Sequence, residues 1–403
     1  MDTRMYNVHT HIFNFKCVPT GFLTNYLPRA VVRFLGPLLR IGPVAWTFSK
    51  VMRLIPVEMV KKYQAFVAIG IRNTPQRVFE DMIEAYPEDS AFVVLSMNFD
   101  HMGGGDAPAN YKTQLALVAD VKRKYPNRCY PFLGVDPRMG DAGYLEKFVR
   151  DYFEPEFKGF HGIKLYPSLG FYPSDDRLAR VYAYAEKKRI PVLTHCTRSG
   201  AFYAARKVPA DLLRYRTFNP TPVTTQRHQQ PFYTKDIFTA KPKGCCDAFL
   251  DPVHYYDVLN RFPDLKLCFA HFGGIDEVIK GLSAPGNTGN MAEGYKQETS
   301  WHFIIKDLMS AFRQVRADIS YTLADTSPQF INAITQDIVS PIGDRILFGT
   351  DFFMTLQEKS EKNLYTEFRE ALLKHTPAGM THWEKIIYHN NKEFLSSDFY
   401  IVP

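Results

Sequence analysis

Short apolar runs recur along most of this chain, and segments with a helical pattern of apolar and polar residues separate them. The runs are nearly continuous, as strands of a parallel sheet buried on both faces must be. Several intervening segments open with a helix cap followed by proline, as Thr74-Pro75 and Ser327-Pro328 do. Eight strands alternating with helices predict a (β/α)8 TIM barrel, with residues 1–403 forming one domain. The strands are expected at about residues 5–13, 91–97, 130–136, 159–167, 190–196, 265–271, 315–320 and 345–351.

Two segments interrupt this alternation, residues 14–72 after the first strand and residues 198–250 after the fifth. The first has apolar residues at roughly helical spacing, broken by prolines and arginines. These breaks argue against a membrane span, which needs ~20 nearly uninterrupted apolar residues. We expect a helical lid over the barrel mouth, and the alternative is a basic amphipathic surface for a membrane or an acidic partner. The second segment has no clear period and predicts a loop insertion.

The net charge of +7 is concentrated in the first insertion. Between residues 16 and 62 there are eight lysines and arginines and one acid, so the rest of the chain is balanced. A broadly basic nucleic-acid binder is therefore not indicated. The six cysteines form no C-x-x-C pair, and the N-terminus lacks the apolar segment of a signal peptide. A cytoplasmic protein with reduced thiols is expected.

Possible metal ligands stand at the ends of four predicted strands. His9 and His11, spaced i, i+2, point to the same side of an extended strand. Each residue alone has an ordinary explanation, such as a buried, hydrogen-bonded histidine or a helix cap. Their joint occurrence at strand ends favours a functional site, because catalytic groups of such barrels lie there. The other candidates are His195 on strand five, His271 on strand six and Asp351 on strand eight, with Lys164 near the end of strand four.

Together these strand ends resemble the amidohydrolase superfamily, and most closely its amidohydrolase-related branch of metal-dependent hydrolases and decarboxylases. The resemblance implies that His9, His11, His195 and Asp351 bind one divalent ion, most simply Zn²⁺. It also implies that His271 and Asp351 act on the attacking water. The motifs that carry it are NVHTH at 7–11, GIKLYP at 162–167, VLTH at 192–195, FAHFGG at 269–274, LFGTD at 347–351 and YHNNKEF at 388–394.

The resemblance allows two roles for Lys164. In two-metal members a strand-four lysine is carboxylated and bridges both ions, and the chain keeps the residues that such a site needs. With one metal, which we favour, Lys164 would bind an anionic group of the substrate as a point charge. Tyr166 and Arg198 are candidate neighbours for the same group.

Two activities follow from the resemblance. The first is hydrolysis of an amide, lactone or other ester in a small, carboxylated molecule, through water activated by the metal. The second is non-oxidative decarboxylation of an aromatic or unsaturated acid with the same ligands. A barrel that has lost its chemistry and serves as a scaffold is disfavoured, because all the expected ligands are present. The expected partner is a small anionic substrate, and self-association into a homo-oligomer is left open.

Overall fold

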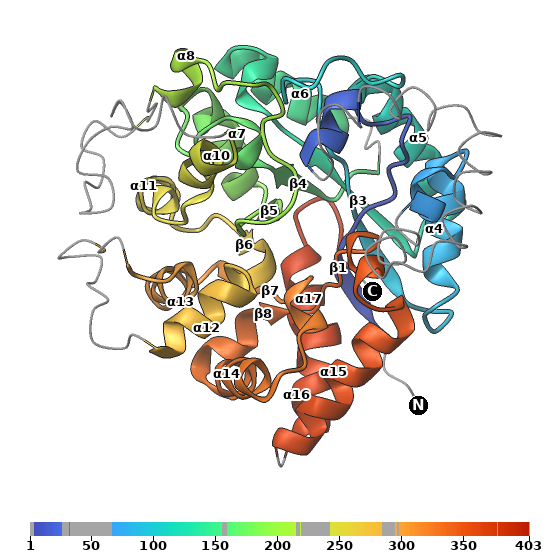
Figure 1. The fold of residues 1–403 in the computed structure, drawn as a ribbon, viewed down its shortest axis with the longest axis vertical. Coiled ribbons are helices and arrows are strands. Elements are labelled where there is room, and N and C mark those ends of the chain that lie inside the picture. The colour runs from blue at the N-terminus through green and yellow to red at the C-terminus, as the bar shows by residue number, and fades with distance from the viewer. Residues whose placement is uncertain are drawn as a thin grey trace.

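The computed structural model describes residues 4–25, 32, 67–154, 159–214, 218, 242–283, 295, 298–376 and 378–402. Its centre is one sheet of eight parallel strands in the order β1 to β8. Helices surround the sheet on its outside (Figure 1). The predicted barrel is confirmed. The strands are β1 (Tyr6–Thr10), β2 (Ala91–Leu95), β3 (Cys129–Gly134), β4 (Gly162–Leu165), β5 (Val192–Thr194), β6 (Leu267–Phe269), β7 (Val315–Asp318) and β8 (Ile346–Leu347).

The ring of strands is closed by hydrogen bonds between the first strand and the segment around β8. Val8 N donates to Phe348 O over 3.0 Å, and Asp351 N donates to His9 O over 2.8 Å. Thr10 forms a further parallel bridge with Phe352. The chain segment bearing Asp351 is therefore fixed directly beside the strand that bears His9.

The helices follow the strands as the sequence predicts. Thr74 and Ser327 cap their helices through side-chain hydrogen bonds to the backbone, which agrees with the predicted starts. The principal helices are α4 (Pro75–Ile83), α5 (Tyr111–Lys124), α6 (Ala142–Phe153), α7 (Ala179–Lys187), α11 (His254–Arg261), α12 (Ile275–Ser283), α13 (Trp301–Ala311), α14 (Pro328–Val339), α15 (Glu361–His375), α16 (Gly379–Glu384) and α17 (Asn390–Leu395).

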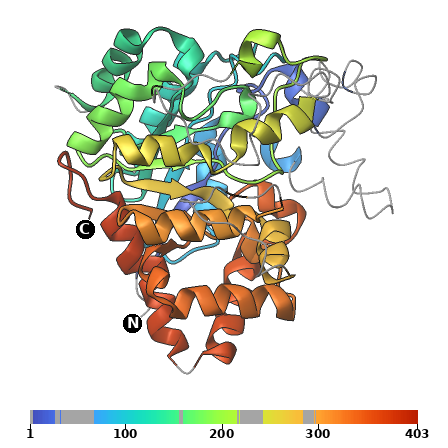
Figure 2. The same cartoon turned by 90° about the vertical axis from the view of Figure 1, so that its left-hand side faces the viewer.

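Inside the barrel, apolar side chains fill the end at which the strands begin. Tyr6, Val8, Tyr130 and Phe132 are buried there, and Phe394 of α17 packs against them. This end of the molecule, with both chain termini, lies opposite the loops that follow the strands (Figure 2). The polar residues at the strand ends are thus left at the other end, where the barrel opens.

A register shift between Asn7 and Thr10 changes the direction of the side chains along β1. Tyr6 and Val8 pack into the barrel core, and strict alternation would turn His9 and His11 away from it. The irregularity inserts a residue, so both histidines also face the barrel interior. The sequence pattern alone does not show this bulge.

The two insertions differ in how far the structure describes them. Residues 26–31 and 33–66 of the first lie outside the described residues, and so does most of the predicted lid. Its beginning includes the short helix η1 (Thr20–Asn25), whose Gly21 N donates to Gly104 O at the mouth. Within the second insertion, α8 (Ala210–Leu213) and α10 (Pro242–Leu250) are helical. The segment predicted as a loop insertion therefore includes two helices.

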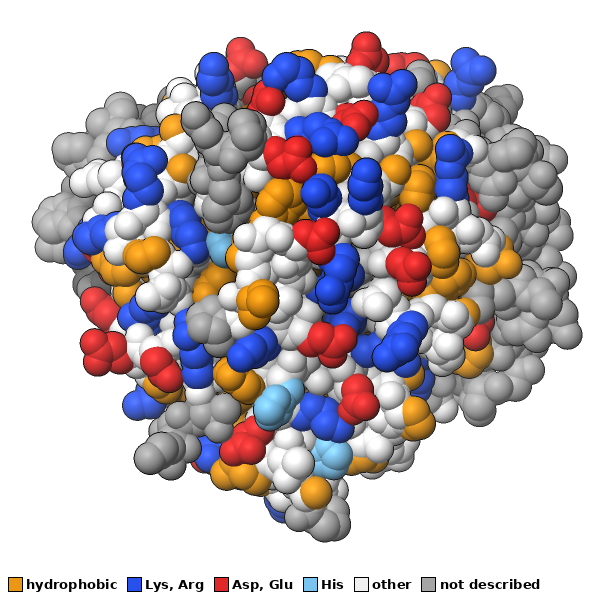
Figure 3. Space-filling model, turned by 180° about the vertical axis from the view of Figure 1, so that it is seen from behind, with side chains coloured by type: hydrophobic (Ala, Val, Ile, Leu, Met, Phe, Trp, Pro, Cys, Tyr) orange, Lys and Arg blue, Asp and Glu red, His pale blue; other side chains and the backbone are white. Residues whose placement is uncertain are grey.

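The face opposite the mouth carries basic and acidic side chains side by side, without a broad field of one sign (Figure 3). Among the described helices, none has the length and apolar character needed to cross a membrane. The described cysteines Cys17, Cys129, Cys196, Cys246 and Cys268 are free, buried thiols.

Candidate metal and catalytic site

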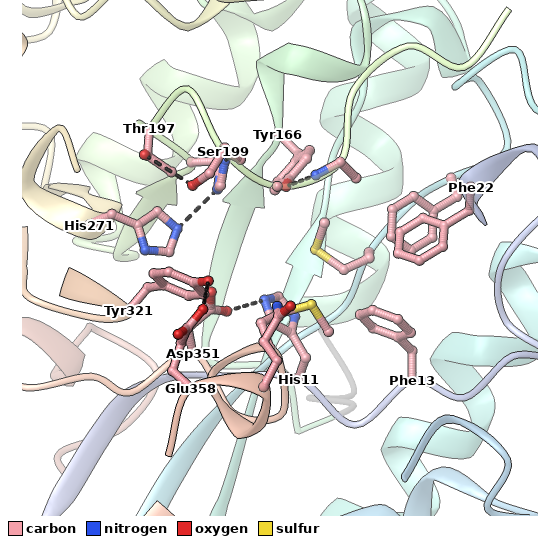
Figure 4. Close-up of a pocket in the computed structure, with 17 residues that line it drawn as sticks. His11, Phe13, Phe22, Tyr166, Thr197, Ser199, His271, Tyr321, Asp351 and Glu358 are labelled. Carbon is pink, nitrogen blue, oxygen red and sulfur yellow. Dashed lines mark hydrogen bonds and ion pairs between the residues drawn. The ribbon is translucent and has the colours of Figure 1, made fainter. Parts of the chain in front are cut away.

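A cavity of about 450 Å³ opens at the mouth of the barrel. Its floor carries His11, His195, His271 and Asp351, and its far side is aromatic (Figure 4). Of the predicted site residues, these four and Tyr166 line this cavity, and His9 lies buried beneath His11 and Asp351. Four strand ends thus meet at one place.

His9, His11 and Asp351 form one cluster of inward-facing ligand atoms. Asp351 Oδ1 lies 3.5 Å from His9 Nε2 and 3.1 Å from His11 Nε2. The three ligand atoms lie within 4.8 Å of one another, a spacing at which one ion can be shared. All three residues are buried.

The opposite ring nitrogens allow both histidines to turn Nε2 toward an ion. Nδ1 of His9 lies 3.0 Å from a carboxylate oxygen of Asp318, and Nδ1 of His11 lies 3.4 Å from Leu95 O. Because these oxygens only accept, His9 Nδ1 donates to Asp318 and the neutral His9 ring keeps a lone pair on Nε2. His11 can take the same tautomer when an ion is bound, and without an ion its Nε2 donates to Asp351 Oδ1 over 3.1 Å. His9 Nε2 is buried and has no hydrogen-bond partner among the described residues. Two imidazole Nε2 atoms and a carboxylate therefore converge, and a cation between them could be bound by all three.

Asp318, at the end of β7, is the residue that the sequence analysis missed. Its Oδ1 accepts from the backbone N–H groups of His271 and Ser320, each over 3.0 Å, and its Oδ2 accepts from His9. A carboxylate that holds the second nitrogen of a metal-binding histidine fixes its orientation. The sequence does contain a signal for Asp318, because an acidic residue stands near the end of the predicted strand at 315–320, and the other residues of the site also stand at strand ends.

His195 lies beside His271, outside the cluster of His9, His11 and Asp351. The two rings face each other, with 3.1 Å between His195 Nδ1 and His271 Nε2. His195 Nε2 donates to Ser199 O over 2.9 Å. Burial, His271 and Lys164 together lower the pKa of His195, and burial also lowers that of His271. Both rings are therefore neutral at physiological pH.

Three residues of the site have backbone conformations that residues other than glycine rarely adopt. His271 has φ 64°, Tyr321 has φ 60° and Asp351 has φ 65°. Each follows the end of a different strand, where the chain turns sharply out of the barrel. Such outliers cost of order 1–3 kcal/mol each and persist where the surroundings hold them. Their clustering at one mouth is typical of a functional site.

The charge of Asp351 suits a proton acceptor. Burial favours its protonated form, but the hydrogen bond from His11 and the imidazoles of His9 and His271 outweigh burial and hold the pKa of Asp351 below its usual value. The side chain is thus a carboxylate at neutral pH. It lies on the cavity floor, where it can face a bound molecule.

Lys164 is fully buried behind Tyr166 and does not line the principal cavity. Its Nζ has no hydrogen-bond partner among the described residues and lies 5.5 Å from the centre of the Tyr166 ring. Burial lowers the pKa of Lys164 to about 8, although Asp318 and Asp351 oppose the shift. An amine with this pKa is still mostly protonated at pH 7, but it loses its proton at a much lower pH than an ordinary lysine does.

The two other predicted substrate contacts differ in their surroundings. Tyr166 lies on the cavity wall, with its ring 4.2 Å from that of His195 and its hydroxyl accepting from Ala201 N. Arg198 points away from the cavity floor, and its Nε donates to Glu277 over 3.0 Å. It lines a neighbouring recess, which also contains His271.

The wall opposite His271 is built from aromatic and thioether side chains. Phe13 contacts Phe22, Phe99 and Phe353 in edge-to-face geometry, at ring distances of 6.0, 5.6 and 5.2 Å. Met97 and Met354 complete this wall. Among the described residues that line the principal cavity there is no lysine or arginine. The cavity therefore combines an apolar wall with a polar floor.

Comparison with known proteins supports one family. A model of the amidohydrolase family matches residues 114–390, which is more than half of the chain. The match begins after β1, so the ligand pair His9 and His11 rests on the motif and on the geometry described above. No curated protein matches the chain in sequence.

Three solved structures share the barrel over nearly their whole length. A 5-carboxyvanillate decarboxylase from Novosphingobium aromaticivorans, complexed with manganese, is 13% identical with a TM-score of 0.53, covering 98% of this chain and 96% of its own. A dihydroxybenzoic acid decarboxylase from a Polaromonas species, with bound manganese, is 13% identical with a TM-score of 0.52 (98% and 97%). A probable 2-pyrone-4,6-dicarboxylic acid hydrolase from Acinetobacter baumannii is 13% identical with a TM-score of 0.50 (97% and 99%). At these identities the likeness shows the fold.

Proposed function

Because this chain belongs to the amidohydrolase family, we propose that it is a metal-dependent hydrolase of an amide, lactone or other ester bond in a small, carboxylated molecule. The observation that carries this proposal is the convergence of the Nε2 atoms of His9 and His11 on the carboxylate of Asp351. The resemblance in sequence and the family match support the proposed class of enzyme, and the geometry supports the proposed site.

The donor set suits a divalent metal ion. His9, His11 and Asp351 would hold it. The His271 ring centre lies 4.7 Å from that of His9, and His195 lies beside His271. Imidazole nitrogens with one carboxylate favour Zn²⁺, and the manganese in two structural neighbours makes Mn²⁺ the main alternative. A bound divalent ion would polarise the carbonyl of the substrate and lower the pKa of a bound water toward ~7. With one ion, Lys164 stays an unmodified amine, whereas a second ion would require its carboxylation.

The protein's own groups supply the proton transfers. The Asp351 carboxylate on the cavity floor accepts a proton from the attacking water and returns it to the leaving group. His271 shares this floor, and its backbone is fixed by Asp318. Its Nδ1 donates to Ser320 O over 2.9 Å, so Nε2 is the nitrogen free to orient or deprotonate a water.

The charged side chains around the cavity restrict where an anionic group of the substrate can bind. Since the described lining has no lysine or arginine, an anionic group on the substrate would find its charge partner in the metal ion or in the recess beside Arg198. The aromatic wall suits an apolar or planar body. We therefore expect a compact molecule with one apolar end.

A second candidate function is decarboxylation of an aromatic acid. The edge-to-face wall around Phe13 favours it, because an aromatic ring would pack there. In that reaction the carbon–carbon bond to the carboxylate breaks and a protonated group delivers a proton to the ring carbon. The products differ, so the two functions are separable by direct measurement.

The test is to offer metal-loaded protein a set of aromatic acids and a set of amides, lactones and esters. Hydrolysis in ¹⁸O-labelled water places the label in the released acid, and decarboxylation releases CO₂ without such incorporation. Label incorporation supports the hydrolase. Release of CO₂ alone overturns it in favour of the second candidate.

A further inference from the structure

A second lobe of about 290 Å³ adjoins the cavity beside His271. The cavity itself, with its wall of Phe13, Phe22 and Phe99, is called here the aromatic lobe. The second lobe, lined by Arg198, Asp276 and Glu277, is called the polar lobe. Both lobes are lined by Thr197, Ser199, His271 and Tyr321.

The boundary between the lobes lies at His271, whereas His11 and Asp351 line the aromatic lobe alone. In Figure 4, His271, Thr197 and Tyr321 stand at one end of the cavity and Phe13 and Phe22 at the other, with Asp351 and His11 between them. A molecule that spans both lobes would place its middle beside the catalytic groups. A bond broken there would leave one product in each lobe.

The polar lobe is built to be rigid. Gly274, with φ 97°, lies so close to Thr197 that an added Cβ would stand 2.4 Å from Thr197 Oγ1. A parallel bridge joins Thr197 to Gly273. The loops after β5 and β6 are therefore locked together, and the lobe between them has a fixed width.

Arg198 is held in place on the wall of this lobe. Its Nε donates to Glu277 over 3.0 Å, its Nη1 lies 3.5 Å from a carboxylate oxygen of Asp247, and its guanidinium lies 4.0 Å from the Trp301 ring centre. Glu277 is itself fixed, because its second oxygen accepts from Trp301 N over 2.7 Å. Nη2 takes part in none of these pairs, and 42% of the side chain is exposed. A preorganised guanidinium with a spare edge is suited to a carboxylate.

We infer that the substrate is a two-part acyl amide of the N-acyl amino acid type, with its apolar acyl group in the aromatic lobe and its amino-acid carboxylate at Arg198. The inference rests on the proposed hydrolysis. In the reaction, the oxygen of water joins the acyl carbon, the C–N bond breaks, and the amine nitrogen takes the proton. The acid stays in the aromatic lobe and the amino acid in the polar lobe.

Binding tests the two-lobe assignment without turnover. 4-Oxo-4-phenylbutanoate is a ketone that mimics N-benzoylglycine and cannot be hydrolysed at that position, and propiophenone lacks only its carboxylate group. Calorimetry on metal-loaded protein should show that the carboxylate compound binds at least tenfold more tightly. Arg198→Met should abolish this gain. Phe99→Leu, as a matched change in the other lobe, should weaken both compounds by the same factor.

Kinetics and thermal melts complete the test. Each variant should melt within a few degrees of the parent, and kcat/KM for N-benzoylglycine should exceed that for N-methylbenzamide only while Arg198 is present. Equal binding of the two ketones, or a gain that survives Arg198→Met, overturns the inference. Hydrolysis of both amides without dependence on Arg198 also overturns it and leaves the hydrolase standing. The predicted binding pattern without hydrolysis of any amide, lactone or ester supports the lobes and refutes the hydrolase.

Discussion

His195 Nδ1 and His271 Nε2 face each other across 3.1 Å, and each carries a lone pair. The other nitrogen of each ring lies 2.9 Å from a carbonyl oxygen, that of Ser199 for His195 and that of Ser320 for His271. A carbonyl only accepts, so the protons are on those outer nitrogens when the rings are neutral. The facing lone pairs repel each other unless a cation lies near both. This pair thus repeats the arrangement of His9 and His11 around Asp351.

Metal loading should therefore stabilise the protein. We expect about one equivalent of Zn²⁺ or Mn²⁺ in the purified protein, and a rise of several degrees in Tm when metal is returned to the chelated form, because an ion binding only the folded state stabilises it. His11→Asn should lower both the metal content and this rise. Elemental analysis and thermal melts measure the two effects. His375→Asn, an exposed change on α15, is the control and should alter neither.

A glutamine at position 195 offers a second measurement on the same pair. The amide of His195→Gln can donate a hydrogen bond to His271 Nε2, which removes the repulsion in the metal-free state. The metal-free variant should melt at or above the temperature of the metal-free parent. Its gain in Tm on adding metal should be smaller. A metal-free variant that melts well below the parent would contradict this account of the pair.

Asp351→Asn should separate catalysis from folding. The change keeps the size of the side chain but removes the proton acceptor, so kcat should fall by at least ~10²-fold, within the usual range for loss of a general base. Asparagine tolerates the positive φ of this position at least as well as aspartate. The far-ultraviolet circular dichroism should stay unchanged. A kcat near that of the parent would exclude Asp351 as the proton shuttle, and the exposed change Asp264→Asn is the matched control.

The sequence predicts the barrel because periodicity and capping are local properties. Thr74 and Ser327 cap the helices that were expected. Seven of the eight strands lie inside the predicted ranges, and β3 begins one residue before its range. The strand-end rule also brings His9, His11, His271 and Asp351 together. These features depend on neighbours along the chain and on the general geometry of the fold.

Other features depend on contacts between distant segments, which periodicity does not encode. The bulge in β1 is a matter of register against β2. Asp318 acquires its role only because β7 passes beside His9, 309 residues away in the sequence. The placement of Arg198 likewise depends on Glu277 and Trp301, which follow the next strand. Local sequence patterns therefore cannot identify these partners.

Asp318→Asn should weaken metal binding without removing a ligand. Asparagine keeps the oxygen that accepts from the backbone of His271 and Ser320, but its amide faces His9 Nδ1 with a donor. His9 must then turn or change tautomer, so metal affinity should fall ~10–100-fold, as for other partners of metal-binding histidines. Competition with a fluorescent chelator measures this. Asp325→Asn, in the loop before α14, should leave the affinity unchanged, and equal affinities in both variants would refute the positioning role.

Glu361 links the strand of Asp351 to β1 through a buried hydrogen-bond network. Its Oε1 accepts from Tyr86 Oη over 2.6 Å and from Thr350 Oγ1 over 2.5 Å. Asn7 Nδ2 donates to the same two hydroxyl groups. Oε2 of Glu361 has no hydrogen-bond partner among the described residues. Burial raises the pKa of Glu361 to about 7, above the ordinary 4.5, despite these hydrogen bonds.

This shift makes the stability of the metal-free protein depend on pH with a definite sign. Between pH 4.5 and about 7 the folded state binds more protons at Glu361 than the unfolded state, so the free energy of unfolding falls as pH rises through this window. The loss should be at most about 3 kcal/mol for a shift of this size. Glu361→Gln keeps an accepting oxygen and cannot ionise, so its stability should lack this component. Urea unfolding of both proteins at pH 5 and pH 8 measures the difference, in which other titrating groups cancel. The free energy of unfolding of Glu361→Gln should rise relative to that of the parent as pH rises. The control Glu367→Gln, on the exposed side of α15, should show no such change. A pH-independent difference for Glu361→Gln would show that the Glu361 carboxyl group of the parent is ionised throughout.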